Sequence, residues 1–197
     1  MAKTRVQMVE ETRAKLLGAA RKAFAEKGYS GASMDDLTAA VGLTRGALYH
    51  NFGDKTGLLR AVIDQLDAEM LARAALARAA QPTLWDGFLA EGLSWIESAL
   101  DPEVRRIMLL DGPAVLGDPS GWENQTACLR ASTLTLAQLQ AEGVVAPGID
   151  PEAAARLING AALQAALWIA AAEAPGPVHD RATQAFRVLV GGLRVAG

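Results

Sequence analysis

Apolar residues recur at spacings of three and four along most of the chain, as in amphipathic helices, and the alternating pattern typical of strands is absent. Glycines and prolines interrupt this pattern at intervals. The sequence therefore predicts an all-α protein of about nine helices. They are expected at residues 9–27, 34–41, 45–51, 55–80, 83–99, 103–111, 120–142, 152–172 and 178–194. The Gly- and Pro-rich segment 113–121 is expected to be a loop or a pocket entrance.

Residues 33–55 carry the densest pattern of helix ends in the chain. Ser33 precedes two aspartates, which suit the first turn of a helix because the helix dipole favours negative charge there. Gly42 is placed to end that helix, and Thr44 is placed to cap the next one. Two short helices joined by such a tight turn are typical of a helix-turn-helix, which lays its second helix in the major groove of DNA.

The second of these helices has one apolar side and one side suited to nucleic acid. Leu48 and Phe52 are four residues apart and are expected to pack inward. Arginine forms paired hydrogen bonds with guanine or phosphate, and a tyrosine hydroxyl donates to phosphate. Glycine permits close approach of the backbone to DNA, and a lysine at a helix start binds phosphate. The residues that offer these groups are Arg45, Gly46, Tyr49, His50 and Lys55. Each alone is consistent with a solvated helix face, but together they favour DNA binding.

The same region resembles the N-terminal domain of the TetR family of transcriptional regulators. The resemblance covers residues 12–63 and rests on Ala20, Phe24, Gly28, Tyr29, Met34, Leu37, Val41, Gly42, Gly46, Leu48, Tyr49, Phe52, Lys55, Leu58 and Leu59. It implies an all-helical homodimer, usually a repressor, with a DNA-binding domain at 1–54 and a ligand-binding and dimerisation domain at 55–197. The DNA-contacting residues that it implies are Ser33, Thr44, Arg45, Gly46, Tyr49, His50, Asn51 and Lys55. Asn51 stands where many members have histidine, and asparagine still donates to phosphate.

Charge divides the chain near the same boundary. Residues 1–60 hold 10 Lys or Arg and 6 Asp or Glu, a net of +4, whereas residues 61–197 hold 9 and 16, a net of −7. A basic head on an acidic body suits a protein whose N-terminal part alone meets phosphate. Lys3 and Arg5 either add an arm on DNA or belong to a solvated tail.

The larger part of the chain is expected to enclose a ligand cavity and to dimerise through its last two helices. Aromatic and methionine side chains suit a flat or bulky apolar ligand. The candidate ligand contacts are Trp85, Phe88, Trp95, Met108, Trp122 and Leu129, with polar candidates at Arg105, Arg106, Asp111, Glu123, Asn124 and Arg130. The residues expected at the dimer interface are Leu157, Gly160, Ala161, Leu167, Ala171, Ala182, Phe186, Leu189, Val190 and Leu193. Ordinary intramolecular core is the alternative in both cases.

Enzymatic chemistry has little support in the sequence. The two histidines, His50 and His179, lie far apart in the chain, and no nucleophile elbow, Cys/His pair, phosphate loop or paired metal ligands occur. No metal or other cofactor is therefore expected. The single cysteine, Cys128, forms no internal disulfide, which fits a reducing cytosol, and a redox-sensing role for it stays open. No apolar run suited to a membrane helix and no basic-plus-apolar leader stands out, so we expect a cytoplasmic protein without membrane association.

The predicted function is regulation of transcription. We expect a dimeric repressor that binds a palindromic operator in double-stranded DNA and is released by a small, largely apolar ligand. The alternative is a constitutive DNA-binding protein with a filled body and no ligand. The sequence identifies neither the operator nor the ligand.

Overall fold

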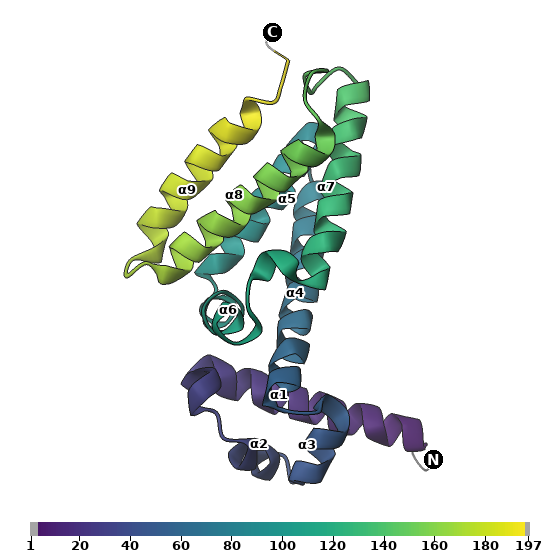
Figure 1. The fold of residues 1–197 in the computed structure, drawn as a ribbon, viewed down its shortest axis with the longest axis vertical. Helices are drawn as coiled ribbons and strands as arrows, with labels where there is room; N and C mark the ends of the chain where they lie inside the picture. Colours follow the sequence, from purple (N-terminus) through teal and green to yellow (C-terminus); the bar gives the residue numbers. More distant parts are fainter. Residues whose placement is uncertain (1–3, 196–197) are drawn as a thin grey trace.

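The computed structural model describes residues 4–195, without the side chains of Val6, Glu123 and Asn124. Within this range the chain has nine α-helices, one π-helix and two short 3-10 helices, and its only β pairing is an isolated bridge between Val145 and Arg194. The first three helices form a head at one end of the molecule, α4 leads away from it, and α5–α9 form a body at the other end (Figure 1). The predicted all-α class is confirmed.

The head consists of α1 (Arg5–Gly31), α2 (Met34–Ala40) and α3 (Arg45–Phe52). The first helix begins earlier than predicted because Thr4 and Gln7 form a capping box, in which each side chain bonds the other's backbone N–H. Arg5 is consequently helical and does not belong to an extended arm, while Lys3 lies outside the described residues. Gly28 breaks the helix at φ 70°, as the sequence suggests, and one more helical turn follows it.

One apolar core fills the head. Leu16 and Phe24 from α1, Leu37 from α2 and Leu48 from α3 are each at most 2% exposed, and Leu58 at the start of α4 is fully buried against them. Burial of such side chains stabilises the fold by about 1.5–3 kcal/mol each. Helices as short as α2 and α3 are only marginally stable alone, so packing on this core fixes their orientation.

The helix α4 (Lys55–Ala79) joins head and body. Its predicted inner face, Leu59, Val62, Leu66 and Met70, is buried along its whole length. It packs against α1 at one end and against α5 at the other (Figure 1). A tilt of α4 would therefore change how head and body are arranged.

The body follows with α5 (Leu84–Glu97), η1 (Ser98–Leu100), η2 (Val104–Asp111), α6 (Gly112–Leu116), η3 (Pro119–Gly121), α7 (Glu123–Ala141), α8 (Pro151–Ala171) and α9 (Pro175–Gly191). Two expectations need correction. The helix predicted at 103–111 is a π-helix, and the expected loop at 113–121 contains two short helices. The last helix also starts earlier than predicted, because prolines fit the first turn, where backbone N–H groups need no partner within the helix.

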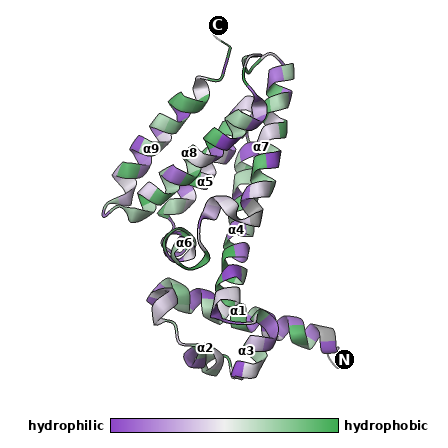
Figure 2. Ribbon diagram, in the orientation of Figure 1, coloured by the Kyte–Doolittle hydropathy of each residue, from purple (hydrophilic) through white to green (hydrophobic). Residues whose placement is uncertain are grey.

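Hydrophobic and hydrophilic residues interleave along the long helices, including α8 (Figure 2). By length and composition α8 is nevertheless apolar enough to cross a membrane, contrary to the expectation that no such run exists. Its inner residues Ala155, Ala166 and Ile169 are fully buried in the body core, and α8 packs against both α7 and α9. Packing within the body thus explains the apolar character of the inner side of α8.

The outer surface of α8 and α9 differs in part from the predicted interface. Ala182, Phe186 and Val190 are buried in the chain's own core. The exposed apolar residues are Leu157 and Trp168 on α8 and Val188 and Leu189 on α9. We name these four residues the α8–α9 face.

Candidate DNA interface and body cavity

Side-chain caps fix the two helices of the helix-turn-helix. The Ser33 hydroxyl accepts from the Asp36 N–H at 3.4 Å, and the Thr44 hydroxyl accepts from the Ala47 N–H at 3.2 Å. Gly42 lies between the helices at φ 67°, a conformation that other residues rarely adopt. These local interactions start α3 at the position that the sequence predicts.

The outer side of α3 is open to solvent. Arg45, Gly46, Tyr49 and His50 are exposed, whereas Leu48 on the opposite side is fully buried. Ser33 and Thr44, at the starts of α2 and α3, are exposed as well. The structure thus brings these predicted contact residues together around one end of the molecule.

Arg45 has a partner that the sequence did not reveal. Its guanidinium forms an ion pair and two hydrogen bonds with the carboxylate of Asp35 on α2, and this contact raises the pKa of Arg45. Both side chains are more than half exposed, so solvent screens the pair. Binding of a phosphate or a guanine by Arg45 would compete with Asp35.

The end of α3 is tied to α1 by Arg13. The Arg13 guanidinium lies 4.6 Å from the centre of the Phe52 ring and donates to the backbone carbonyl of Asn51 at 3.0 Å. The Asn51 side chain donates to the Ala47 carbonyl at 2.8 Å, which leaves one of its amide protons for another acceptor. Sequence reasoning missed Arg13 because no motif marks a contact between residues 38 positions apart.

Lys55 begins α4 next to the head. Its amine lies 4.5 Å from the centre of the Tyr29 ring, and the Tyr29 hydroxyl hydrogen-bonds to Thr56 at 3.2 Å. Asp54 caps the helix by accepting from the Gly57 N–H at 2.7 Å. A Cβ atom at Gly57 would lie 2.0 Å from the Phe52 carbonyl oxygen, so this tight turn requires glycine. Together these contacts hold the lysine at the helix start.

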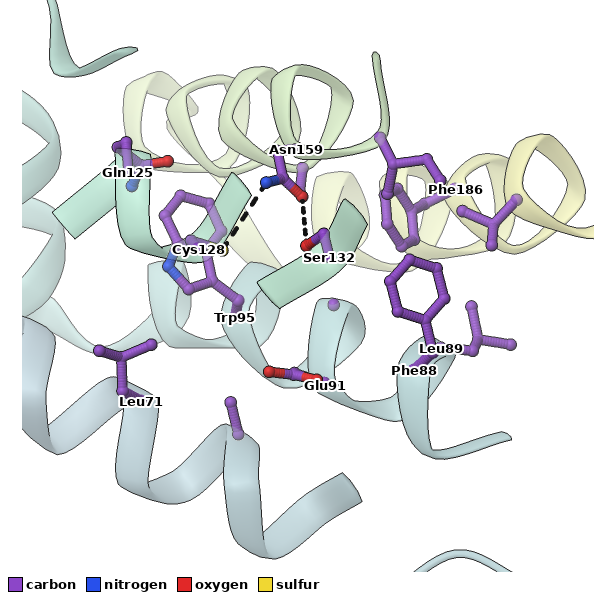
Figure 3. A pocket seen from close by; sticks show the side chains of 15 residues that line it. Leu71, Phe88, Leu89, Glu91, Trp95, Gln125, Cys128, Ser132, Asn159 and Phe186 are labelled. Atoms are coloured by element: carbon purple, nitrogen blue, oxygen red, sulfur yellow. Dashed lines mark hydrogen bonds between the residues drawn. The ribbon is translucent and has the colours of Figure 1, made fainter. Parts of the chain in front are cut away.

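The body contains a cavity between α4, α5, α7, α8 and α9. The space between its walls is about 650 Å³ when the open mouth is counted. Phe88 and Phe186 lie at one end, and Trp95 and Gln125 lie towards the other (Figure 3). The lining is mostly apolar, as small-molecule sites usually are.

Two of the six candidate ligand contacts, Phe88 and Trp95, line this cavity. The other four lie elsewhere, because their helices turn them to different neighbours. Trp85 stacks under Arg194, Met108 is buried in η2, Trp122 packs over Gly112, and Leu129 packs against the core.

Two polar candidates, Arg106 and Asp111, do not line this cavity, whereas the single cysteine does. Arg106 and Asp111 pair with each other near the head, while the side chains of Glu123 and Asn124 lie outside the described residues. Cys128 lines the cavity, and burial raises the pKa of its thiol, so the thiol stays protonated at neutral pH.

Head and body meet at an ionic contact. The Arg21 guanidinium on α1 donates to both oxygens of Glu69 on α4, at 2.5 and 2.9 Å. It also donates to both oxygens of Glu103, which precedes η2, at 2.8 and 2.7 Å. We name these three residues the Arg21 bridge. Nearby, Asp111 at the end of η2 accepts from the Tyr29 N–H at 2.7 Å. Hydrogen bonds from α1 therefore reach both ends of η2.

Two family models match the chain. One, described as bacterial regulatory proteins, tetR family, matches residues 16–62. The other, described as tetracyclin repressor-like, C-terminal domain, matches residues 85–193, more than half of the chain.

Solved and curated relatives agree with these models. The crystal structure of a TetR-family transcriptional regulator from Pectobacterium atrosepticum is 45% identical, covers 98% of this chain and 99% of that one, and has a TM-score of 0.88. An HTH-type transcriptional repressor of Mycobacterium tuberculosis is 32% identical over 125 residues, which are 61% of this chain and 62% of that protein. The repressor AcnR of Corynebacterium glutamicum is 44% identical over 59 residues, 30% of this chain and 31% of AcnR. The chain thus matches less than two thirds of either curated relative's length.

Its relatives regulate transcription and are not enzymes, which confirms that no catalytic function should be expected. The capped helix-turn-helix and the helical body are the two parts that the family models describe. The chain belongs to the TetR family of DNA-binding transcriptional regulators.

Proposed function

We propose that the protein is a homodimeric repressor that binds a palindromic operator through α3 and is released when a small, largely apolar molecule enters the body cavity. The observation that carries the proposal is the exposed, capped α3 on a basic head, joined by α4 to a body with an apolar cavity. Relatives described as HTH-type transcriptional repressors support the sign of regulation. Such a regulator acts in the cytoplasm.

The proposed DNA contacts are those around α3 and the start of α4: Ser33, Thr44, Arg45, Gly46, Tyr49, His50, Asn51 and Lys55. In this proposal Arg45 and His50 contact base edges, and Lys55 contacts a phosphate. The N-terminal N–H groups of α4 add further donors next to Lys55. Because two-fold symmetry repeats this surface, the operator is expected to contain two matching half-sites.

Replacing Tyr49 with Ala is expected to weaken operator binding by about 10- to 150-fold, since a hydrogen bond to a charged phosphate contributes about 1.5–3 kcal/mol. Half of the Tyr49 side chain is exposed, so the melting temperature should change by no more than about 2 °C. Gel shift and thermal unfolding measure the two effects. Tyr49→Phe is the matched comparison, because it removes only the hydroxyl and so separates the loss of this hydrogen bond from the loss of the ring. A large drop in melting temperature would show that Tyr49 supports the head core instead.

The α8–α9 face is the proposed dimer interface. Leu157 and Val188 are each 73% exposed, and Trp168, with Arg181 over its ring at 5.3 Å, is 44% exposed. Leu157, Gly160, Gln164, Trp168 and Ala171 recur at spacings of three and four and are all exposed, which gives α8 a continuous outer stripe. Exposed apolar surface of this kind marks interaction sites, and two such helices from each chain would form a four-helix interface.

A charge at one end of this stripe, on its most exposed large apolar residue, should separate the dimer. Leu157→Glu is expected to give a protein with the mass of one chain in analytical ultracentrifugation and to lose operator binding, because buried unpaired carboxylates are costly. Leu76→Glu is the matched control, since Leu76 on α4 is also an exposed leucine, at 72%, but lies off the α8–α9 face. If both variants sediment like the unaltered protein, the interface lies elsewhere.

The cavity favours a ligand-responsive regulator over the constitutive alternative. A body that only supports a DNA-binding head would be expected to fill its interior, because voids cost packing energy. Ligand binding between α4 and α5–α9 would stabilise one arrangement of these helices, and α4 also carries part of the head core. A ligand with different affinities for two such arrangements changes the occupancy of DNA.

The test of the proposed function is a gel shift with DNA from upstream of the protein's own gene, in excess non-specific competitor. A retarded band that survives the competitor supports a sequence-specific regulator. If the band disappears with competitor, selection from a random DNA pool follows. Failure to enrich any palindromic sequence there would overturn the proposed operator binding.

A further inference from the structure

One wall of the body cavity carries a short polar strip among apolar side chains. Ser132 Oγ donates to Asn159 Oδ1 at 3.2 Å, and Asn159 Nδ2 donates to Cys128 Sγ at 3.7 Å (Figure 3). A carboxamide has two N–H donors and two acceptor lone pairs. Among the described residues, these two bonds use one of each. Asn159 therefore has one donor and one acceptor left for a further partner.

The position of Asn159 is unusual for its helix. The flanking residues on the inner side of α8 are Ile158 and Ala162, and both are buried. Asn159 itself is partly buried. Asparagine forms helices less readily than alanine, and partial burial of its amide without full hydrogen bonding has a cost. A bound polar group would satisfy the remaining donor or acceptor.

Among the described residues that line the cavity, one side chain is ionised, and it belongs to an ion pair. Glu91 is the one carboxylate among the lining residues that the structure describes, and Arg78 holds it at 2.8 Å. The lining contains no Lys, Arg or His in the described part of the chain, and the thiol of Cys128 is protonated. An anionic ligand would therefore lose its hydration without meeting a counter-ion.

The rest of the lining suits a flat apolar group. Phe88 and Phe186 lie beyond one end of the polar strip, and Trp95 lines the cavity towards the other end (Figure 3). Aromatic side chains pack well against aromatic or other planar apolar ligands. The apolar surfaces and the polar strip thus face the same space.

Resting on the effector function proposed above, we propose that the effector is an uncharged molecule with a flat apolar body and one carbonyl or hydroxyl group, and that Asn159 determines this specificity by binding that group beside Ser132. The paired Glu91 gives no advantage to a cation, and the absence of a lining cation disfavours an anion. The specificity therefore follows from one amide in an otherwise uncharged cavity.

Three matched probes test this ligand class in isothermal titration calorimetry with the full-length protein. They are 2-acetylnaphthalene, 2-ethylnaphthalene and 2-naphthoate, which share a ring system and differ in the side group. We expect the ketone to bind about three- to tenfold more tightly than the hydrocarbon, the factor that one net hydrogen bond provides. The carboxylate should bind at least about 100-fold more weakly than the ketone, because its charge is buried without a partner.

Asn159→Leu isolates the proposed specificity residue. This variant should bind the ketone and the hydrocarbon equally while keeping its melting temperature within a few degrees. Gln138→Leu makes the same change from amide to leucine on the exposed side of α7 and should keep the original preference. Leucine has the same number and branching of side-chain heavy atoms as asparagine, so loss of preference would not result from an empty space.

The outcomes separate this proposal from the function on which it rests. Equal binding of ketone and carboxylate, or an unchanged ketone preference in Asn159→Leu, would overturn the proposal. If none of the probes binds to a protein that still shifts its operator, the ligand class is wrong and the repressor function stands. If the protein shifts no DNA, the proposed function fails irrespective of the probes.

Discussion

Raising the salt concentration from about 50 to 200 mM is expected to weaken operator binding by about a thousandfold. Each phosphate neutralised by a cation releases a counterion, and the logarithm of the binding constant falls by about 0.9 per phosphate for each unit in the logarithm of salt concentration. Two heads that each place about three cations on the backbone would neutralise about six phosphates. The net charge of +4 on residues 1–60 supplies these cations, whereas the acidic body adds none at the operator.

The salt dependence also tests Lys55 separately. Lys55→Gln removes one cation from each head, so the slope should fall by about two for the dimer, with similar loss on every DNA sequence. Lys22→Gln is the control, since Lys22 on α1 is exposed and paired with Glu26 within the same helix. Fluorescence anisotropy at five salt concentrations measures the slope. A slope near zero would show that phosphate contacts do not anchor the head.

Replacing Arg21 with Met is expected to lower the free energy of unfolding by about 2–3 kcal/mol, somewhat less than breaking a fully buried pair. The Arg21 side chain is 21% exposed, and its removal leaves Glu69 and Glu103 facing each other without a cation. For a chain of this size the melting temperature should fall by about 5–10 °C. Operator binding should also weaken, because α1 loses its ion pairs with Glu69 on α4 and with Glu103 before η2.

The control for this prediction is Arg156→Met, which removes an exposed pair with Glu152 within α8 and should cost less than about 0.5 kcal/mol. Acid provides a second comparison. The hydrogen bonds from Arg21 lower the pKa of Glu69, so the stabilisation from Glu69 is present above its unfolded pKa of about 4.3 and is lost as pH falls through the lower folded value. The difference between Arg21→Met and the unaltered protein should therefore shrink below about pH 4. A difference that stays constant with pH would mean that Arg21 acts through packing.

Local interactions explain why so much of the head could be predicted. The caps at Ser33 and Thr44 and the glycine between the helices act within four residues, so their pattern is visible in the sequence. The buried face of α4 follows from helical periodicity in the same way. Both kinds of information are contained in short windows of sequence.

Contacts between distant segments could not be predicted in this way. Arg21 meets residues 48 and 82 positions away, and Arg45 meets Asp35 across the turn. The same holds for the tryptophans. The sequence of an amphipathic helix predicts that an aromatic residue points inward, but its neighbours depend on how the helices pack. Trp95 consequently faces the cavity, whereas Trp122 packs over Gly112.

The Arg21 bridge also limits how proteins of this architecture can exchange parts. A chimera that joins α1–α3 of one regulator to the body of another keeps α4 continuous, yet in this chain α1 supplies the cation for two carboxylates of the other part. A grafted head without arginine at position 21 would leave Glu69 and Glu103 uncompensated. A chimera that combines the operator specificity of one regulator with the effector specificity of another must therefore also keep the Arg21 bridge.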